Sequence, residues 1–316
     1  MSQPIYIATR GSALALAQAN RILADCRAAF PQRAFELKII KTTGDKLQTA
    51  SLANPDAKLP KGLFTKELEV ALLDGSADLA VHSLKDLPTE LPDGLRLGAV
   101  TQREDPRDVL ILRSPAKSLA DLPQGAVVAS SSTRRQAQLK SLRPDLRCIE
   151  IRGNVGTRLR KVAESADFHA TMLAAAGMNR LGYRIGADGT LSGPDVPAGI
   201  CTMPFAATDM IPAVGQAAVG LEIRDGDADL QAICDRLNHA ATWHCVTAER
   251  AFLRAMGGGC QSPVAAHATL RDGKLHLAAV SFQTGQGNLG AGSGMPEQGT
   301  EIGRIVAASI DAAKVA

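Results

Sequence analysis

Two hydrophobic periods alternate through the first hundred residues. Residues 5–8 form a short apolar run and residues 35–41 alternate apolar with polar side chains, and both patterns predict strands. Residues 12–30 and 63–74 show the spacing of helices, and residues 79–83 form another apolar run that predicts a buried strand. Strands and helices in alternation are typical of an α/β fold.

A polar stretch interrupts this pattern at residues 43–62, which contain two prolines and two glycines among lysines and aspartates. Long connections without regular structure are often functional loops. We therefore expect a mobile loop beside a site.

A second alternating unit begins near Val109. Residues 127–129 and 147–151 predict strands, and each leads through a short polar turn into a predicted helix, at 134–142 and from Arg158 onward. In such units, ligands bind at the carboxyl ends of the strands, where helix N-termini attract anions. The two turns are therefore candidate anion sites.

The last third of the chain has a different pattern. Residues 182–210 are rich in Gly, Pro and Asp and lack periodicity, which predicts a connector, and a helix follows over 248–255. Two alternating runs around Asp272-Gly273 predict a hairpin at 264–282. The apolar face of a terminal helix is predicted to cover this hairpin with Ile302, Ile305, Val306 and Ile310. These elements predict a small α+β domain.

Composition narrows the function classes. A chain of 316 residues is long enough for two or three domains, and an aromatic content of 3% disfavours proteins that stack single-stranded bases on aromatic rings. The sequence has no apolar N-terminal leader and no apolar run of about 18 residues, so we expect a cytoplasmic protein and no membrane partner. Six scattered cysteines and six dispersed histidines indicate neither disulfides nor a metal site.

Arginine dominates the basic residues, with 23 of the 35, although the net charge is only +3. A run of basic residues over 134–160 is either a solvated face or a binding surface, because guanidinium groups bind carboxylates and phosphates in bidentate fashion. Arg134 and Arg135 open a helix, where the dipole disfavours cations, and this placement predicts a bound anion. Arg152 and Arg158 flank the Gly-Asn-Val-Gly-Thr turn, whose glycines allow close approach of a ligand.

Polar residues also gather at two strand ends in the first unit. Arg10 ends a strand, and Ser12 is a natural N-cap for the helix that carries Gln18. A carboxylate at this strand end could bind the Arg10 guanidinium group and the N–H groups of the helix N-terminus together. Lys85 and Asp86 follow another strand. Lys85 could bind an anion and Asp86 could act as an acid/base group in a cleft, or both could belong to a solvated turn.

Cys260 follows three glycines. This context leaves a thiol accessible, which suits a nucleophile or an attachment point, whereas the alternative is an inert cysteine.

Together these motifs resemble the porphobilinogen deaminase (hydroxymethylbilane synthase) family. The resemblance spans nearly the whole chain, and the motifs occur in the family's order. They are Ile-Ala-Thr-Arg at 7–10, Lys-Gly-Leu-Phe-Thr-Lys-Glu-Leu-Glu at 61–69, Ala-Val-His-Ser-Leu-Lys-Asp-Leu-Pro at 80–88, Arg-Glu-Asp-Pro-Arg-Asp at 103–108, Ser-Ser-Thr-Arg-Arg-Gln at 131–136, Arg-Gly-Asn-Val-Gly-Thr-Arg at 152–158, Pro-Ala-Val-Gly-Gln at 212–216 and Gly-Gly-Cys-Gln at 258–261.

The resemblance implies an α/β fold with two lobes like those of periplasmic binding proteins and a third, small α+β domain that carries the cofactor cysteine. It places lobe one, with the catalytic aspartate and the mobile loop, at residues 1–105 and 212–235. Lobe two, rich in arginine and binding carboxylates, is expected at 106–211, and the third domain at 236–316.

The family belongs to tetrapyrrole biosynthesis, the route to haem, chlorophyll and cobalamin. Its members are transferases that join four porphobilinogen molecules head to tail with loss of ammonia and release hydroxymethylbilane by hydrolysis. The primer is one dipyrromethane per chain, held covalently through a thioether, and that role would fall to Cys260. Porphobilinogen would be the small-molecule substrate, with no nucleic acid and no obligatory protein partner, and the chain would be a monomer.

The resemblance also assigns roles by position. Asp86 would be the catalytic carboxylate, stabilising the azafulvenium cation left by ammonia loss and the pyrrolenine nitrogen after coupling. The cofactor would be bound by Cys260, Lys85, Ser131, Ser132, Arg134, Arg135 and Arg158. The substrate would be bound by Arg10, Ser12, Gln18, Phe64, Arg103, Arg152 and Arg180.

Some positions depart from the family pattern. A lysine expected four residues before Lys61 is replaced by Ala57, with Lys58 beside it, and Ala217 stands where a glycine is expected. His169 replaces a common aspartate, and residues 185–210 form a longer connector than usual. None of these positions belongs to the inferred catalytic set.

Two other function classes compete with an enzyme. The same lobes could bind a polyanion without turnover, as transport receptors do, although a receptor has no use for Gly-Gly-Cys-Gln. A nucleic-acid binder could use the 134–160 stretch, but the few aromatics and the near-neutral charge count against it.

Overall fold

The computed structural model describes residues 3–44, 64–259 and 262–312. The chain divides into two compact units, which we call unit 1 (residues 1–104 and 218–244) and unit 2 (residues 105–217 and 245–316). The three-domain boundaries that the resemblance implies stay a prediction. Gln216 belongs with unit 2 because its side chain donates hydrogen bonds to Pro106 O and Asp108 Oδ1, and residues 228–237 belong with unit 1 because they pack on its sheet.

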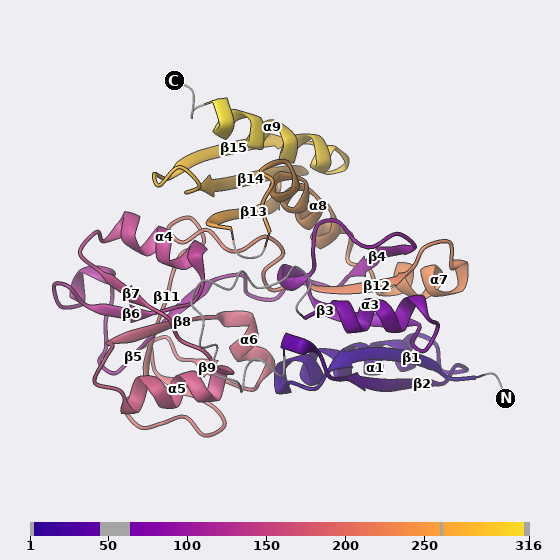
Figure 1. The fold of residues 1–316 in the computed structure, drawn as a ribbon, viewed down its shortest axis with the longest axis horizontal. Helices are drawn as coiled ribbons and strands as arrows, with labels where there is room; N and C mark the ends of the chain where they lie inside the picture. The colour runs from indigo at the N-terminus through magenta and orange to yellow at the C-terminus, as the bar shows by residue number, and fades with distance from the viewer. Residues whose placement is uncertain (1–2, 45–63, 260–261, 313–316) are drawn as a thin grey trace. The chain divides into compact units, whose positions relative to one another are not determined.

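Unit 1 is built on a mixed five-stranded sheet with the order β2-β1-β3-β12-β4. The strands are β1 (Ile5–Arg10), β2 (Phe35–Ile40), β3 (Leu79–Ser83), β4 (Leu95–Val100) and β12 (Val219–Arg224). Strand β1 runs parallel to β2 and β3, whereas β12 runs antiparallel to β3 and β4. The helices of this unit are α1 (Ala13–Ala29), α3 (Lys66–Leu73) and α7 (Ala228–Leu237), and the short helix η1 (Leu84–Asp86) follows β3 directly (Figure 1).

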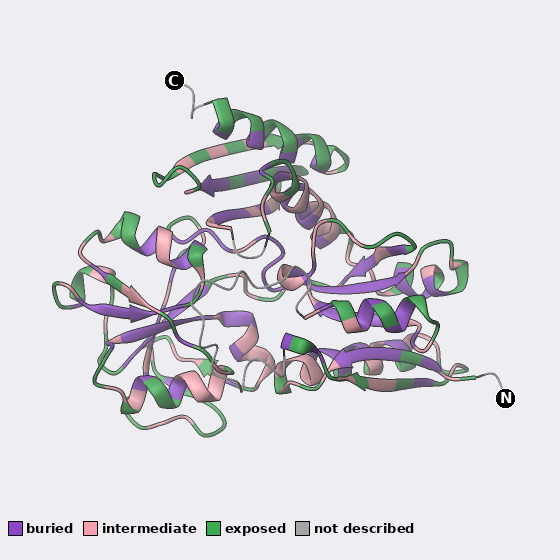
Figure 2. Cartoon of the chain, viewed as in Figure 1, coloured by how far each residue is buried: buried purple, intermediate pink, exposed green. Residues whose placement is uncertain are grey.

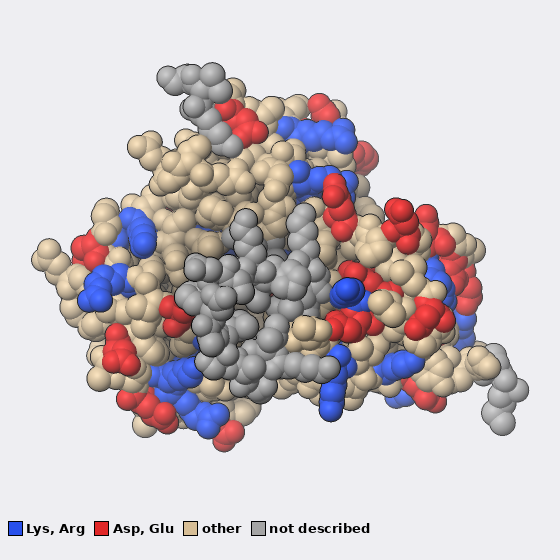
Figure 3. Space-filling model, viewed as in Figure 1, with Lys and Arg blue, Asp and Glu red and all other residues tan. Residues whose placement is uncertain are grey.

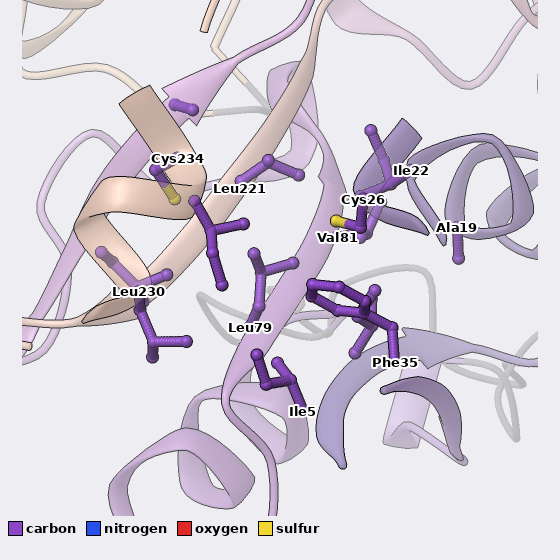
Figure 4. Close-up of a cluster of buried hydrophobic side chains, with 14 of the residues drawn as sticks. Ile5, Ala19, Ile22, Cys26, Phe35, Leu79, Val81, Leu221, Leu230 and Cys234 are labelled. Atoms are coloured by element: carbon purple, nitrogen blue, oxygen red, sulfur yellow. The ribbon is translucent and has the colours of Figure 1, made fainter. Parts of the chain in front are cut away.

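The larger core of unit 1 lies between the sheet, α1 and α7. Leu79, Val81 and Leu221 of the strands pack against Ile22 of α1 and Leu230 of α7 (Figure 4). Two cysteines, Cys26 and Cys234, belong to this core. Burial raises the pKa of both Cys26 and Cys234 to about 12, so these thiols stay protonated and unreactive.

Unit 2 contains a second mixed sheet, in the order β11-β5-β8-β6-β7. Its strands are β5 (Asp108–Leu112), β6 (Val127–Ala129), β7 (Arg147–Ile149), β8 (Ala170–Ala174) and β11 (Cys201–Pro204). The helices beside it are η2 (Leu119–Asp121), α4 (Thr133–Leu142), α5 (Val155–Glu164) and α6 (Ala175–Arg180). Strand β6 is parallel to β7 and β8, so the carboxyl ends of these three strands meet at one edge.

The predicted connector at 182–210 is more ordered than its composition suggested. It contains the two-residue strands β9 (Arg184–Ile185) and β10 (Leu191–Ser192), which pair antiparallel, and β11, which joins the sheet. Helix α5 also begins three residues before the predicted start, because the Asn154 side chain accepts a hydrogen bond from Thr157 N and caps it.

Unit 2 also contains a small antiparallel sheet, β13-β14-β15, covered by a helix. Its elements are α8 (Ala240–Ala255), β13 (Val264–Arg271), β14 (Lys274–Ser281), β15 (Asn288–Gly294), η3 (Pro296–Gln298) and α9 (Gly299–Ala312). The predicted hairpin is confirmed, but the third strand was not expected. The predicted apolar face of α9 was partly wrong: Ile302, Val306 and Ile310 are buried, whereas Ile305 is 56% exposed. Buried and exposed residues alternate along this helix (Figure 2).

Backbone strain marks one of the departures from the family pattern. Ala217 is buried and has a φ of 72°, a left-handed conformation that costs an L-residue with a Cβ atom roughly 1–2 kcal/mol. Glycine adopts this conformation without the steric cost. The left-handed conformation therefore explains why a glycine is expected at position 217.

We expect Ala217→Gly to raise the free energy of unfolding by about 0.5–1 kcal/mol, since relief of strain outweighs the larger entropy of the unfolded chain. Urea unfolding of the two proteins measures the difference. Ala218→Gly is the matched control, because Ala218 is equally buried with no positive φ, and it should destabilise. A lower stability of Ala217→Gly than of the parent would contradict the assignment of strain.

None of the helices in the described part of the chain is long and apolar enough to cross a membrane. On the face drawn in Figure 3, basic and acidic side chains lie side by side over the surface of unit 1.

Candidate active site

A pocket in unit 1 lies where β1 and β3 end. The two strands are parallel, so their carboxyl ends meet at the same sheet edge, and the residues that follow them come together. The pocket is lined by five of the residues predicted from the sequence: Arg10, Ser12, Gln18, Phe64 and Asp86. Thr65, His82 and Ser83 complete its polar lining.

Arg10 and Phe64 form one wall of this pocket. The Arg10 guanidinium carbon lies 4.2 Å from the centroid of the Phe64 ring, a cation–π contact. Phe64 immediately follows residues 45–63, which lie outside the described residues. This stretch contains most of the predicted mobile loop at 43–62. The Phe64 ring covers one face of the Arg10 guanidinium group.

Ser12 and Gln18 take part in the local structure of the same pocket. The Ser12 side chain accepts a hydrogen bond from Ala15 N and caps α1, as its position predicted. Gln18 is buried on α1 and exchanges hydrogen bonds with the Ser83 hydroxyl at 2.9 and 3.1 Å. These contacts fix helix α1 against the end of β3.

Asp86 and Lys85 lie on η1, directly after β3, and both are half-buried. Asp86 lines the pocket and is the one carboxylate among its lining residues in the described part of the chain. Arg103 is also half-buried, and its backbone N–H donates to the Thr242 hydroxyl at 3.0 Å.

In unit 2, Arg134 and Arg135 have an internal anion. Asp108 is fully buried and accepts hydrogen bonds from Arg134 Nη1 at 2.7 Å and from Arg135 Nη2 at 2.6 Å. Gln216 Nε2 adds a third partner at 3.1 Å. The anion that the helix start predicted is thus supplied, at least in part, by the protein itself, and both guanidinium groups are over nine-tenths buried.

The charge of this cluster is nonetheless not balanced. Two guanidinium groups face one carboxylate, and Arg158 lies near enough to Arg135 for their charges to interact. Burial, together with the charge of Arg135, lowers the pKa of Arg158 to about 10. Arg158 donates from Nε to Gly153 O at 2.9 Å, and among the described residues no carboxylate pairs with it. Arg158 is half-buried and has no paired carboxylate among the described residues, so the carboxylates of a dipyrromethane would fit its charge.

The remaining predicted residues of unit 2 have different environments. Ser131 exchanges hydrogen bonds with the backbone of Ile151 at 2.7 and 3.1 Å, and Ser132 caps α4. Arg152 is exposed and lies 3.6 Å from Glu150. Arg180, on α6, donates to Ala217 O at 2.6 Å. The serines therefore shape the ends of β6 and β7, while Arg152 presents its charge to solvent.

Cys260, the predicted cofactor attachment point, and Lys58 and Lys61 lie outside the described residues. Within residues 3–44, 64–259 and 262–312, no three His, Cys, Asp or Glu side chains are grouped so as to hold a metal ion.

Four acidic residues that are buried in the described part of the chain were not identified from the sequence. Asp108 heads the apolar strand β5, and Glu222 lies within the apolar strand β12. Glu69 lies on the buried face of α3, and Glu249 lies on α8. A charged residue inside an apolar run was the available signal, because such residues are almost never fully buried unless paired.

The sequence of the chain matches family models and curated relatives over most of its length. The family model described as "Porphobilinogen deaminase, dipyromethane cofactor binding domain" matches residues 5–232, and the porphobilinogen deaminase C-terminal domain model matches residues 243–310. The porphobilinogen deaminase of Syntrophobacter fumaroxidans is 43% identical over 304 residues, covering 96% of this chain and 92% of the relative. That of Syntrophomonas wolfei is 44% identical over 308 residues, covering 97% and 94%.

Solved structures resemble the chain more distantly. The VFT2 domain of Bordetella pertussis BvgS has a TM-score of 0.44 at 14% identity, covering 74% of this chain and 86% of that one. The periplasmic aliphatic sulphonate binding protein of Escherichia coli has a TM-score of 0.42 at 14% identity, covering 81% and 71%.

The α/β fold with two lobes and a small α+β domain, expected from the sequence, is confirmed by the two mixed sheets and the separate antiparallel sheet. The family assignment rests on the two domain models, which together cover most of the chain, and on relatives of about its own length. The chain belongs to the porphobilinogen deaminase family.

Proposed function

We propose that the chain carries out the porphobilinogen deaminase reaction with Asp86 as its catalytic carboxylate, in the pocket of unit 1. The observation that carries this assignment is the placement of Asp86 beside Arg10 among the pocket-lining residues, where described residues provide no second carboxylate. A single anion beside a cation can bind an acidic substrate and still stabilise positive charge that develops on it.

The chemistry follows from the charge changes in the substrate. When the C–N bond of porphobilinogen breaks, ammonia leaves with the bonding electrons and the pyrrole ring becomes cationic. The Asp86 carboxylate, fixed on η1, stabilises this cation by an interaction that strengthens as the charge forms. Arg10 binds a carboxylate of the same substrate and sets its orientation, and Phe64 keeps water from the guanidinium face.

A dipyrromethane, when bound, would supply the pyrrole carbon to which the first substrate is joined. We assign its carboxylates to Lys85, Ser131, Ser132, Arg134, Arg135 and Arg158, and the substrate carboxylates to Arg10, Arg103, Arg152 and Arg180 with Ser12, Gln18 and Phe64. The surplus of cations over carboxylates around Arg158 supports this assignment, because a growing chain of acidic pyrroles is self-repelling unless its charge is matched. We also propose a cytoplasmic monomer with no obligatory protein partner.

The attachment through Cys260 predicts a covalent adduct. We expect the intact mass of the purified protein to exceed the mass of the polypeptide by one dipyrromethane, and the same measurement on Cys260→Ser to show the bare polypeptide. Cys201→Ser is the matched control, because Cys201 is a partly accessible thiol outside the proposed attachment point and its variant should retain the adduct. An unmodified parent protein, or an adduct that survives Cys260→Ser, would remove the thioether from the proposal.

A further inference from the structure

Three titratable side chains form a buried cluster in unit 1 beneath the pocket. His82 of β3 and Glu222 of β12 are 5% and 0% exposed, and His82 Nε2 lies 2.8 Å from Glu222 Oε2. Glu69 of α3 is 8% exposed and interacts electrostatically with both. His82 also lines the pocket that contains Asp86, so the cluster connects the pocket with the interior of the unit.

The hydrogen bonds of the cluster are incomplete. Oε1 of Glu222 and Oε1 of Glu69 are buried, and the described residues offer neither atom a hydrogen-bond donor. Burial raises the pKa of Glu69, and the charge of Glu222 raises it further. A raised pKa favours the protonated form of a buried carboxyl group, so Glu69 is the member of the cluster best suited to carry a proton.

The surroundings of His82 determine what that proton can do. The strand β12 contributes Glu222, helix α3 contributes Glu69 and Glu67, β1 ends in Arg10, and η1 carries Lys85 and Asp86. Helix α1 packs on the opposite sheet face, where its buried side chains, Gln18, Ala19, Ile22 and Cys26, carry no charge. Helix α3 also carries Lys66 and β12 also carries Arg224, so basic groups lie on the same elements. Glu222 is the acidic group in hydrogen-bond contact with the His82 ring, at 2.8 Å from Nε2.

The reaction releases such a proton. Each coupling forms a C–C bond at a ring carbon, whose C–H bond then breaks, and the electron pair of that bond returns to the ring. The proton needs an acceptor, while the ammonia set free in the same cycle needs a proton to leave as ammonium. One group that takes up and returns a proton serves both needs.

We propose that His82, Glu222 and Glu69 form a proton-holding network that accepts, through Asp86, the proton released at each coupling. Asp86 contacts the substrate and takes the proton first, and the His82 ring then receives it. Glu222 holds the ring in one tautomer and stabilises the imidazolium, as a buried carboxylate does for histidine in hydrolases. The three are positioning residues, and their role rests on the proposed function of Asp86.

The pH dependence of turnover tests this role. We expect Glu222→Gln to lower kcat about 10- to 100-fold with KM changed less than about 3-fold, and to move the acidic limb of the pH–rate profile. Asp78→Asn is the matched control, because Asp78 pairs with Arg224 at 2.9 Å at the other end of the same two strands. It should leave the pH profile unchanged. An unchanged kcat and profile in Glu222→Gln would overturn the proposal.

Infrared spectroscopy tests the proton carried by Glu69 independently of turnover. We expect the protein to show a C=O stretch of a buried carboxylic acid near neutral pH that is lost in Glu69→Gln and retained in Asp78→Asn. If Glu69→Gln removes no such band, the network is refuted while the role of Asp86 stands. If the band is present but Asp86→Asn keeps normal turnover, the proposed function fails instead.

Discussion

Replacing Asp86 with asparagine is expected to lower the turnover of porphobilinogen by about 10²- to 10³-fold while the protein stays folded. Asparagine keeps the size and hydrogen-bonding capacity of the side chain but removes the charge. Loss of one preorganised electrostatic group in an enzyme site commonly costs this much in kcat. Asp86 is half-buried on a short helix at the end of β3, so its loss leaves the sheet and its core intact.

Steady-state kinetics of porphobilinogen consumption, with circular dichroism to verify folding, measures the effect. Asp93→Asn is the matched control, because Asp93 is an exposed carboxylate seven residues later and does not line the pocket. It should retain the rate of the parent protein. Turnover of Asp86→Asn within a few-fold of that control would remove Asp86 from its assigned role.

Replacing Asp108 with asparagine is expected to lower the free energy of unfolding by about 3–5 kcal/mol, the usual cost of breaking a buried ion pair. The carboxylate is fully buried between Arg134 and Arg135, and its loss leaves two buried guanidinium groups without a counter-ion. Burial alone would raise the pKa of Asp108, but the charges and hydrogen bonds of the two arginines outweigh it and hold this pKa well below the usual range.

The lowered pKa of Asp108 in the folded state decides how its contribution to the free energy of unfolding depends on pH. A carboxylate whose pKa is lowered in the folded state contributes its full stability above its unfolded pKa of about 3.9, and the contribution is lost as the pH falls further. The stability difference between the parent and Asp108→Asn should therefore be constant from about pH 5 to 8. It should shrink only below about pH 4.

Urea unfolding over this pH range measures both quantities. Asp105→Asn is the control, because Asp105 pairs at 2.7 Å with Arg107, which is 46% exposed, and such surface pairs contribute less than about 1 kcal/mol. If Asp108→Asn unfolded at the same urea concentration as this control, the buried network would not be the source of stability that its geometry indicates.

The elements that the sequence predicted well are those with a local hydrophobic period. The strands β1 and β3 and the helix α1 follow such periods, and their ends were placed within a few residues. Strand β15 was missed because Gly290, Gly292 and Gly294 replace the inward-facing apolar residues. A Cβ atom at Gly292 would lie 2.8 Å from Val306 Cγ2, so the close packing of α9 requires glycine there and removes the pattern.

The same distinction applies to the site. Sequence motifs alone determined the family, and the position of Asp86 after a strand was enough to place it at a sheet edge. Sequence alone also indicated an anion beside Arg134 and Arg135, but not that Asp108 supplies one. Such pairing depends on which strands are neighbours.

Only the tertiary structure showed the two buried networks. His82 and Glu222 are 140 residues apart and meet because β12 is inserted antiparallel between β3 and β4. Asp108 and Arg134 meet because β5 and α4 pack in one unit around a shared interior. A sequence specifies the charge of each side chain, whereas burial, which decides how strongly that charge acts, is set by the packing of distant segments.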